Sequence, residues 1–364
     1  MSDSSPTLLV GTGKGLLIWQ RNAEEWALQA PQFLGFPVPM IYVDPYEGTW
    51  WAGLAHRHWG QKLRCSHDQG QSWQELPMPV FPADALLSNG RPARLRRIWC
   101  MAAAGPDKPD AMWLGAEPGA LFYRPAADRP FELVQGLWDH PSRHNPAQWF
   151  GAGRDHPFIH SIEVDPRDSN HVYVAVSCAG VFETRDGGRT WTPRNEGLIA
   201  AYLPNPHVAV GHDPHRVLLC PAQPDVLWQQ NHCGVFRSTD GAATWQLVND
   251  DAGLADYGFA LAVDESDPEK AWVIPAESDE MRVSRDLALT VSHTNDGGRS
   301  WQALRNGLPR QHAFDIVFRH AFAKAGSFMA FGTTNGNLYV SEDDGQSWQV
   351  LSHQLARVEC VVWG

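Results

Sequence analysis

The sequence has no long apolar run, no paired cysteine motif and no block of like charges. No segment approaches the roughly 18 uninterrupted apolar residues of a membrane span, and the first residues lack the basic and apolar regions of a signal peptide. None of the six cysteines forms a CxxC pair, so we expect buried, reduced thiols rather than a disulfide framework. These features predict a cytoplasmic protein without a membrane partner.

Basic residues are also scarce. Asp and Glu number 41 against 29 Lys and Arg, which gives a diffuse net charge of −12 and argues against nucleic acid as a partner. Large and turn-forming residues are abundant instead, with 17 Trp, 32 Gly and 27 Pro. Such a composition is typical of many short strands packed sheet against sheet.

One phrase, TRDGGRTW at residues 184–191, recurs along the chain with small changes. A Ser or Thr comes first, then Asp two residues later, Gly four, Ser or Thr six and Trp seven. The complete copies are Ser66/Asp68/Gly70/Ser72/Trp73, Thr184/Asp186/Gly188/Thr190/Trp191, Thr294/Asp296/Gly298/Ser300/Trp301 and Ser341/Asp343/Gly345/Ser347/Trp348. A fifth copy, Ser238/Asp240/Thr244/Trp245, has Ala242 where the others have Gly.

Each position of this phrase has a role in a tight turn between two short strands. The Asp carboxylate can accept backbone N–H groups of its own turn, the Gly permits a positive φ, and the hydroxyl residues can tie the ends together. The Trp ring is expected to enter the seam beside the next sheet. We therefore interpret the phrase as a structural staple and expect no catalytic role for its aspartates.

The phrase resembles the Asp-box, or bacterial neuraminidase repeat (BNR), of sialidase-like β-propellers, and in particular of uncharacterised bacterial proteins described as BNR-repeat glycosyl hydrolases. The resemblance implies a propeller whose boxes lie on the turn between the two outer strands of each blade, away from the active site. Sialidases use an arginine triad and a Tyr nucleophile helped by Glu. This sequence has no Arg-Ile-Pro-type motif near its start, and its plausible tyrosines, Tyr202 and Tyr257, have no clear Glu partner. Sialidase activity is therefore not expected.

Seven repeat units can be counted. Five are marked by the box tryptophans, residues 14–29 fit a sixth with Trp26 in the Trp position, and residues 119–134 fit a seventh with Phe131 there. The first unit lacks an inner strand, and the last is followed by a spare one, RVECVVWG at 357–364, which is expected to fill the gap. The sequence thus predicts an all-β, seven-bladed β-propeller of four-stranded antiparallel blades, closed by the C-terminal strand, as a single domain over residues 1–364.

Candidate functional residues gather on the face opposite the boxes. There the turns between second and third strands meet the connections between blades, and polar residues recur. The predicted catalytic residues are Glu117, His160, His232 and Glu277. The predicted ligand-binding residues are His56, His58, Arg97, His215, Asn231, Arg282 and His312. We expect His56 and His58 to share one face of a strand, and His312 to open the inner strand of the seventh blade.

The histidines leave several roles open. They could bind a divalent metal, serve as acid–base groups, hydrogen-bond a polar ligand, or lie scattered on the surface. Arginines gathered in an acidic protein favour a carboxylate or phosphate ligand, because a guanidinium holds such groups bidentately. The long aromatic connection at 136–161 is expected to fold over the site as a lid.

The sequence favours a small anionic or sugar-like ligand that is bound, and in the enzymatic version hydrolysed, in a central pocket lined by His, Arg and Glu. In that version Glu117, His160, His232 and Glu277 act as acid–base or orienting groups, and Arg97 and Arg282 hold the anion. Another branch of box-bearing propellers hydrolyses polysaccharides with two carboxylates. Two alternatives stay open: a non-catalytic scaffold for a protein partner, and a metal-dependent hydrolase that uses the histidines. No metal ligands are assigned, and the sequence identifies no cofactor.

Overall fold

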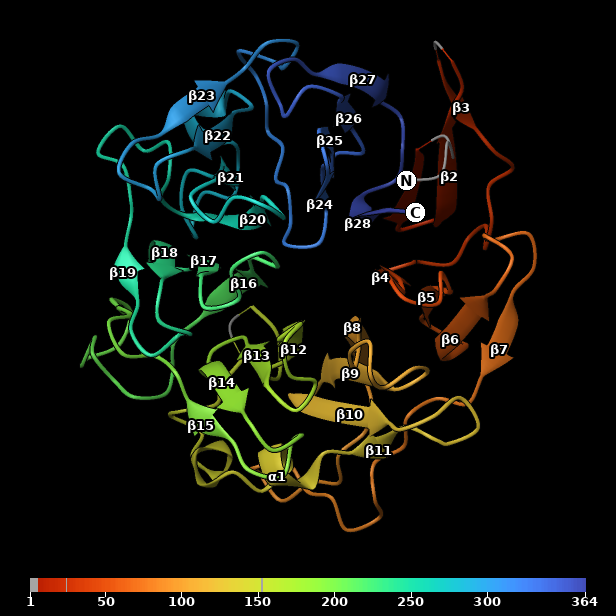
Figure 1. Cartoon of the computed structure of the whole chain (residues 1–364), viewed down its shortest axis with the longest axis vertical. Helices are drawn as coiled ribbons and strands as arrows, with labels where there is room; N and C mark the ends of the chain where they lie inside the picture. The colour runs from red at the N-terminus through yellow and green to blue at the C-terminus, as the bar shows by residue number, and fades with distance from the viewer. Residues whose placement is uncertain (1–5, 24, 152) are drawn as a thin grey trace.

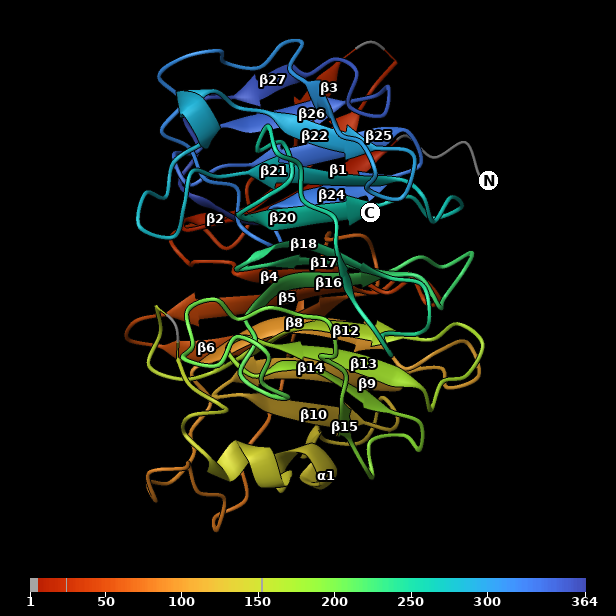
Figure 2. The ribbon, with the colours of Figure 1, turned by 90° about the vertical axis from the view of Figure 1, so that its left-hand side faces the viewer.

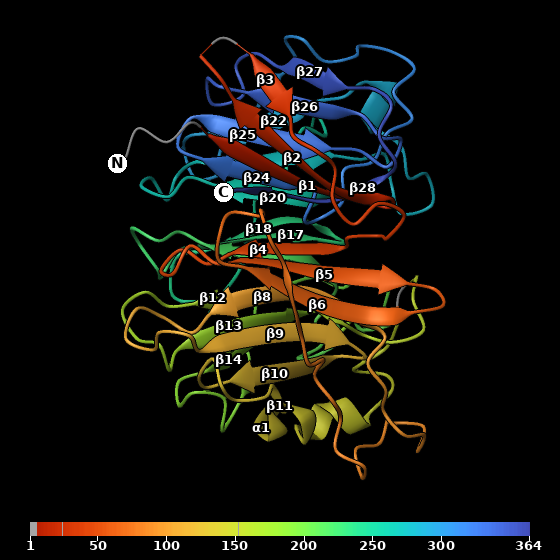
Figure 3. The same ribbon diagram turned by 90° about the vertical axis from the view of Figure 1, so that its right-hand side faces the viewer.

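The strands are arranged around a central channel, as Figure 1 shows for a computed structural model of the chain. The structure describes residues 6–23, 25–151 and 153–364, and within these residues the strands form seven four-stranded sheets. We call the sheets blades 1 to 7 in chain order. Figures 2 and 3 show the strands running between two faces of the ring, so that each strand ends on one face or the other. The predicted fold class is confirmed.

Neighbouring strands within each blade are antiparallel. From the channel outward, blade 1 contains β28 (Val358–Trp363), β1 (Thr7–Thr12), β2 (Gly15–Arg21) and β3 (Trp26–Leu28); blade 2 contains β4 (Met40–Val43), β5 (Trp50–His56), β6 (Gly60–Ser66) and β7 (Gln74–Leu76); blade 3 contains β8 (Arg97–Ala103), β9 (Met112–Glu117), β10 (Ala120–Arg124) and β11 (Glu132–Leu133). Blade 4 contains β12 (Ile159–Val164), β13 (Val172–Val176), β14 (Gly180–Thr184) and β15 (Thr192–Pro193); blade 5 contains β16 (Pro214–Leu219), β17 (Leu227–Asn231), β18 (Gly234–Ser238) and β19 (Gln246–Leu247). Blade 6 contains β20 (Gly258–Val263), β21 (Ala271–Pro275), β22 (Val291–Thr294) and β23 (Gln302–Leu304); blade 7 contains β24 (Phe322–Ala325), β25 (Phe328–Gly332), β26 (Leu338–Ser341) and β27 (Gln349–Ser352).

The C-terminal strand closes the ring. β28 pairs with β1 in antiparallel register, with Leu8 opposite Trp363 and Leu9 opposite Val362. Two residues of this strand, Cys360 and Val361, are only 1% and 2% exposed. The last segment of the chain therefore supplies the inner strand of the first blade, as the sequence predicts, and joins the two ends of the chain within one sheet.

The recurrent phrase forms a hydrogen-bonded turn. In blade 4, Asp186 Oδ1 accepts from the Thr184 hydroxyl at 2.8 Å and from the Thr190 N–H at 2.9 Å, and Asp186 Oδ2 accepts from the Thr190 hydroxyl at 2.6 Å. The Gly188 N–H donates to Thr184 Oγ1 at 3.0 Å. These bonds, the Thr190 hydroxyl foremost, lower the pKa of Asp186 to about 2. The same pattern surrounds Asp68, Asp240, Asp296 and Asp343. The aspartates satisfy their own turns, which is the structural staple expected.

Ala242 fits its box because the backbone of that turn differs slightly. Its φ is 61°, inside the left-handed region near +50° to +70° that a side chain can adopt. In the other four boxes the equivalent φ lies between 83° and 92°, beyond that region, at Gly70, Gly188, Gly298 and Gly345. Only the turn of blade 5 therefore suits a residue with a Cβ.

The box tryptophans pack against the preceding blade rather than the next one. The Trp245 indole donates to the Arg194 carbonyl at 2.9 Å, and the Trp301 indole donates to the Val248 carbonyl at 2.9 Å. Arg194 and Val248 follow the outermost strands of blades 4 and 5, so the expected direction of packing was wrong. These two indoles therefore join the outer edges of neighbouring blades.

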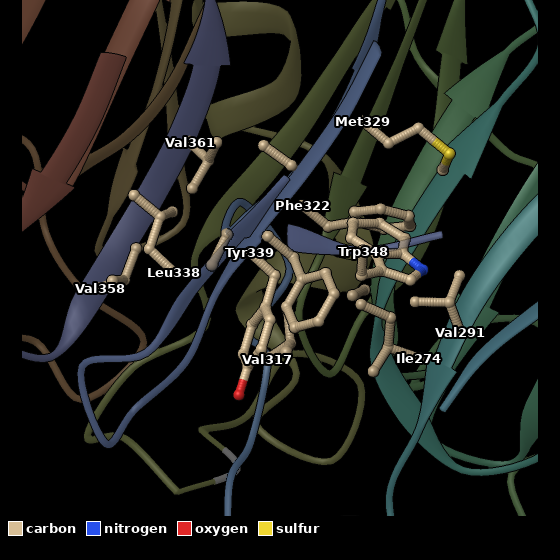
Figure 4. Close-up of a cluster of buried hydrophobic side chains, with 14 of the residues drawn as sticks. Ile274, Val291, Val317, Phe322, Met329, Leu338, Tyr339, Trp348, Val358 and Val361 are labelled. Carbon is tan, nitrogen blue, oxygen red and sulfur yellow. The ribbon is translucent and has the colours of Figure 1, made fainter. Parts of the chain in front are cut away.

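Buried apolar side chains fill the seams between blades. Figure 4 shows one such cluster, in which Trp348, Phe322 and Met329 of blade 7 lie among side chains from both neighbours. Ile274 of blade 6 and Val361 of blade 1 belong to the same cluster, which therefore extends over the seams on both sides of blade 7. Because burying each large apolar side chain contributes about 1.5 to 3 kcal/mol, these seams fix the blades rigidly around the channel.

The connection between blades 3 and 4 does not form the expected lid over its first half. It contains α1 (Gln135–Trp138) and the 3-10 turn η1 (Pro141–His144), and Figures 1 and 2 place α1 at the outer edge of the ring beside β11 and β15. The Trp138 ring packs on Phe81 at 5.1 Å and the Trp149 ring on Phe182 at 5.3 Å. These aromatic side chains are buried in the seams, which draws the segment away from the channel. No helix in the described part of the chain is long and apolar enough to cross a membrane.

Candidate functional site

The inner strands of all seven blades begin at the same end of the central channel, which we call the mouth. The turns between second and third strands lie at this end, whereas the box turns lie at the other. Residues distant in sequence meet here: Arg319 Nε donates to the His215 carbonyl at 2.9 Å, although the two residues are 104 positions apart. The mouth is therefore assembled by the closed ring and not by any single blade.

A carboxylate and two imidazoles form the centre of the mouth. Asp213 lies directly before β16, and its Oδ1 accepts from the Ser177 hydroxyl at 2.8 Å and the Cys178 N–H at 3.2 Å. Its Oδ2 lies 3.3 Å from His215 Nε2 and 3.7 Å from His232 Nδ1. These three ligand-bearing atoms lie within 4.8 Å of one another. We call Asp213, His215 and His232 the Asp–His–His cluster.

Hydrogen bonds orient His215 within this cluster. Its Nδ1 lies 2.6 Å from the Gly258 carbonyl, which can only accept, so Nδ1 carries a proton. The ring stacks on Phe259 with centroids 4.4 Å apart and an interplanar angle of 19°. Burial lowers the pKa of His215, although the neighbouring Asp213 acts in the opposite direction. The ring is thus held in one tautomer with Nε2 facing the carboxylate.

Asp213 stays ionised although it is buried. Burial by itself would raise the pKa of this carboxyl, but the neighbouring His215 and Arg319 and the hydrogen bond from the Ser177 hydroxyl outweigh burial and lower the pKa below its ordinary value. The mouth therefore holds a fixed negative charge on a residue that is only 4% exposed. A buried charge of this kind requires the partners that surround it.

His232 connects the cluster to the open side of the mouth. Its Nε2 lies 3.4 Å from Asp279 Oδ2, and its ring contacts Tyr202 at 5.0 Å and Tyr257 at 5.5 Å between centroids. The preceding residue, Asn231, accepts the Cys233 N–H at 3.0 Å and so shapes the turn that presents His232. Asp279 is 49% exposed, which makes it the accessible carboxylate of this group.

Two arginines beside the cluster form no ion pair with any described residue. Arg319 is 9% exposed, and its Cζ lies 5.7, 5.1 and 5.4 Å from the ring centroids of Trp99, Phe158 and Phe259. Burial lowers the pKa of Arg319 to about 10. Arg282 is exposed, donates from Nε to the Asp279 carbonyl at 3.1 Å, and has its Cζ 5.7 Å from Phe259. Two guanidinium groups thus approach one aromatic ring with no carboxylate of their own.

The Tyr257 hydroxyl is a further polar group without a partner. Tyr257 is 7% exposed, and its buried hydroxyl has no hydrogen bond to the residues that the structure describes. Its ring contacts those of His215 at 5.7 Å and His232 at 5.5 Å. Burial raises the pKa of Tyr257 to about 12, so the group is a neutral hydroxyl at the edge of the cluster.

Two further mouth arginines, Arg97 and Arg154, are ion-paired. Arg97 lies 3.2 Å from a Glu359 carboxylate oxygen, and Arg154 Nε donates to Glu117 Oε2 at 2.6 Å. Both guanidinium groups lie against Trp99, at 4.3 and 5.2 Å from its centroid. Arg154 shows that the second half of the 136–161 connection does reach the mouth. The Glu117 carboxylate, 3% exposed, is occupied by this pairing.

His160 links blades rather than facing the mouth. Its side chain is fully buried, its Nε2 donates to the Pro214 carbonyl at 2.8 Å, and its own carbonyl accepts from His320 Nε2 at 2.7 Å. Burial, with the nearby Arg319 charge, lowers the pKa of His160 well below its ordinary value. The imidazole is neutral and supports the start of β16, the strand that carries His215.

Two expected placements are wrong. His58 lies in a turn and not on the same strand face as His56, because the chain reverses after β5; His56 Nδ1 accepts the His58 N–H at 3.1 Å. His312 does not open the inner strand of blade 7, which begins at Phe322. The backbone after His312 is instead bound to the preceding connection, where the Ala313 N–H donates to the Leu287 carbonyl at 2.9 Å.

Of the residues chosen from the sequence, the structure brings His215, His232 and Arg282 to one place. Glu277 lies apart, accepting the Asp286 N–H at 3.1 Å, and Asn231 bonds to Gln229 and Cys233 within its own blade. His56 and His58 belong to blade 2, across the ring from blade 5 (Figure 1). Asp213 and Arg319 were missed. Asp213 could have been found, because it stands two positions before His215 and alternate positions of an extended chain share a face.

A cavity of about 570 Å³ lies deeper in the channel. Its walls include the ends of the inner strands on the box side, and of the predicted site residues only His160 lines it. Glu163, Arg216 and Lys324 also line it. The Glu163 carboxylate accepts the Leu219 N–H at 3.1 Å, and burial raises the pKa of Glu163 to about 7. Charged side chains thus form part of the lining of the cavity.

Comparison with known proteins gives distant relatives. No protein-family model matches the chain. An oligoxyloglucan-reducing end-specific xyloglucanase from Emericella nidulans is 26% identical over 228 residues, which is 59% of this chain and 26% of that protein. The chain therefore spans about a quarter of the length of this curated relative.

Solved structures share the fold at low identity. An ancestral GH74 enzyme superposes with a TM-score of 0.56 and 15% identity over 98% of this chain and 40% of that one. A candidate 6-phosphogluconolactonase from Bacteroides fragilis gives a TM-score of 0.59 with 10% identity over 100% and 99% of the two chains. YCF48 bound to a D1 peptide gives 0.50 with 12% identity over 86% and 83%. At these identities the likeness concerns the fold alone.

Proposed function

We propose that this chain is a glycoside-hydrolase-like propeller that binds, at its mouth, a saccharide carrying an anionic group. The relationship to a curated xyloglucanase supports the saccharide, since 228 residues of the chain align with that enzyme. The observation that carries the anionic part is the pair of arginines, Arg282 and Arg319, that approach Phe259 without forming an ion pair with any residue described.

A buried guanidinium that has no carboxylate at ion-pair distance is unfavourable unless a ligand supplies one. Arg319 lies among three aromatic rings, and Arg282 reaches the same ring from the exposed side. Guanidinium groups bind carboxylate and phosphate bidentately, and aromatic rings pack on sugar faces. A uronic acid and a sugar phosphate share this chemistry, so both are candidates for the ligand.

Asp279 is the carboxylate that we assign to proton transfer if the bound saccharide is hydrolysed. It is half exposed at the mouth, and His232 Nε2 lies 3.4 Å away and can fix its orientation. Glycoside hydrolysis needs a group that protonates the leaving oxygen and a second group that assists from the other side of the sugar. Arg154 and Glu117 act as positioning residues in this scheme, because their ion pair packs on Trp99.

The binding proposal is tested by thermal unfolding with three probes: glucuronate, glucose 6-phosphate and glucose. We expect one of the two anionic sugars to raise the midpoint progressively as its concentration increases beyond the dissociation constant, and the neutral sugar to have no effect. Arg282→Gln should abolish the shift. Arg299→Gln is the matched control, because Arg299 is 78% exposed beside a box turn. Equal shifts for glucose and the anionic sugars, or an unchanged response in Arg282→Gln, would contradict the proposal.

Hydrolysis is tested separately with nitrophenyl glycosides of the sugar that binds. Asp279→Asn should lower kcat by at least about 100-fold while leaving the thermal shift of the sugar intact, because general acid–base catalysis contributes 10²–10⁴-fold. A chain that binds the anionic sugar and releases no nitrophenol would be a saccharide-binding propeller instead.

A second candidate, docking of a protein partner, is favoured by one surface feature. A groove of about 350 Å³ is lined by Phe33, Phe36 and Leu54 and bordered by Leu34 and Trp59. The last two side chains are 71% and 70% exposed. We expect an apolar peptide segment as the occupant, and Trp59→Ala should then weaken its binding without affecting the sugar response.

A further inference from the structure

The Asp–His–His cluster joins three segments of blade 5. Asp213 precedes β16, His215 is the second residue of β16, and His232 follows β17, so neighbouring strands hold all three side chains. Figure 1 shows β16 and β17 side by side next to the channel. Asp213 Oδ2, His215 Nε2 and His232 Nδ1 lie within 4.8 Å of one another. The arrangement is therefore built by backbone that two paired strands make rigid.

The hydrogen bond at His215 Nδ1 leaves the neutral ring with a lone pair on Nε2, close to a negative oxygen. The Gly258 carbonyl accepts from His215 Nδ1 at 2.6 Å, so the neutral ring has no proton on Nε2. That bare nitrogen lies 3.3 Å from Asp213 Oδ2. Two electron pairs facing each other at this distance repel unless a positive charge lies between them.

His232 repeats the arrangement from the other side. Its Nε2 lies 3.4 Å from the Asp279 carboxylate, whose negative charge favours the tautomer with the proton on Nε2. The opposite nitrogen, Nδ1, then presents a lone pair to Asp213 Oδ2 at 3.7 Å. A histidine that donates from one nitrogen to a carboxylate and ligates with the other is the usual arrangement around protein metal ions.

The remaining oxygen of Asp213 is already satisfied. Ser177 and the Cys178 N–H both donate to Oδ1, at 2.8 and 3.2 Å, while Oδ2 faces only the imidazoles. In addition, the buried Tyr257 hydroxyl has no partner among the residues described, and its ring contacts both imidazoles. An unsatisfied buried hydroxyl beside three converging donor atoms indicates a ligand at this position.

We infer that Asp213, His215 and His232 bind one divalent first-row transition-metal ion. Two imidazoles and one carboxylate suit ions such as Zn²⁺ and Co²⁺, and three protein ligands leave coordination positions open to a further ligand. Gly258, Asp279 and Ser177 form the outer layer that orients the three donors. The inference does not depend on the saccharide proposal, because it rests on the contacts of the cluster alone. A second proton on His215 is the competing occupant.

The inference is tested on the full chain after treatment with a chelator and dialysis. Titration with Co²⁺, followed by visible absorption, and with Zn²⁺, followed by calorimetry, should each show one ion bound per chain. His232→Gln should weaken binding by more than about 100-fold and Asp279→Asn by about 10- to 100-fold, because outer-layer substitutions have the smaller effect. His58→Ala is the matched control and should bind as the wild type does, since His58 lies in an exposed turn of blade 2.

Folding is monitored in the same samples. The His232 side chain is 22% exposed, so His232→Gln is expected to fold, and metal should raise the unfolding temperature of the wild type but not of this variant. Asp213→Asn provides a second test of the same site. Absence of stoichiometric metal binding by the wild type would overturn the inference. The close approach of His215 Nε2 to Asp213 would then be explained by a second proton on His215. Binding retained by His232→Gln but lost in His58→Ala would indicate an adventitious ion only.

The sugar probes, repeated on the chelator-treated protein, separate the two proposals. A thermal shift by an anionic sugar without any metal binding overturns the metal inference and leaves the proposed function standing. Metal binding without a thermal shift by any sugar overturns the proposed function and leaves the metal inference standing.

Discussion

Replacing Arg319 with Met tests whether this arginine serves to bind a ligand or to stabilise the fold. Arg319 is buried among Trp99, Phe158 and Phe259 and makes no ion pair within the described chain. Methionine retains an unbranched apolar side chain of similar length, so it preserves the packing and removes the charge. If the guanidinium serves a ligand, its loss should barely change the stability of the unliganded protein.

The structure sets the size of the expected effect. The pKa of Arg319 falls from 12.5 to about 10, and at about 1.36 kcal/mol per unit this corresponds to roughly 3 kcal/mol against the charged form in the fold. Replacing Arg319 with Met removes this free-energy cost of the buried charge. Against it stand the lost ring contacts, about 0.5 to 1 kcal/mol each, and the lost bond to the His215 carbonyl, about 1 kcal/mol. The two sides nearly cancel, so Arg319→Met should lie within about 1 kcal/mol of the wild type.

Arg194→Met is the matched comparison. Arg194 pairs at 2.6 Å with Glu183, whose carboxylate is 2% exposed. Removing this partner leaves a buried carboxylate less well compensated, and we expect a loss of at least about 2 kcal/mol.

The assay is urea unfolding at pH 7 of the wild type and both variants, with the slopes compared as well as the midpoints. A loss of stability in Arg319→Met as large as that in Arg194→Met would refute the reasoning. Arg319 would then be a structural residue, and the anion-binding proposal would rest on Arg282 alone.

Three further outcomes are expected. Asp186→Ala removes one box carboxylate and should lower the free energy of unfolding by about 1 to 2 kcal/mol in urea titrations, without changing binding at the mouth; a loss of ligand binding at unchanged stability would contradict the staple. Glu163 has its pKa raised from 4.5 to about 7 by burial, so the wild type should lose stability as the pH rises through that window. In denaturant titrations, Glu163→Gln should therefore be more stable than the wild type at pH 8 but not at pH 4.5. The same difference in the free energy of unfolding at both pH values would contradict this prediction. Ending the chain at Arg357 removes β28 and its buried side chains, a loss comparable with the total stability of about 5 to 15 kcal/mol of a typical domain, so calorimetry should show no cooperative transition.

The repeating unit could be predicted from local patterns in the sequence. The box turn is local: Asp186 accepts from a hydroxyl two positions before it and from groups four positions after it, so its bonds follow from composition and spacing. The same spacing located the unit around Phe131, where no box remains, and the spare strand at the C-terminus located the closure of the ring. Short-range hydrogen bonds and strand periodicity carry this information, and both are visible in a single chain.

The mouth, by contrast, was decided by tertiary structure. Arg97 meets Glu359 across 262 positions, and Arg319 meets His215 across 104, because closing the ring brings the starts of all inner strands to one end of the channel. The connections between blades follow no period, so neither the turn at His58 nor the path after His312 could be inferred from spacing. Which polar side chains converge depends on how seven seams pack at once, and that geometry exists only in the closed ring.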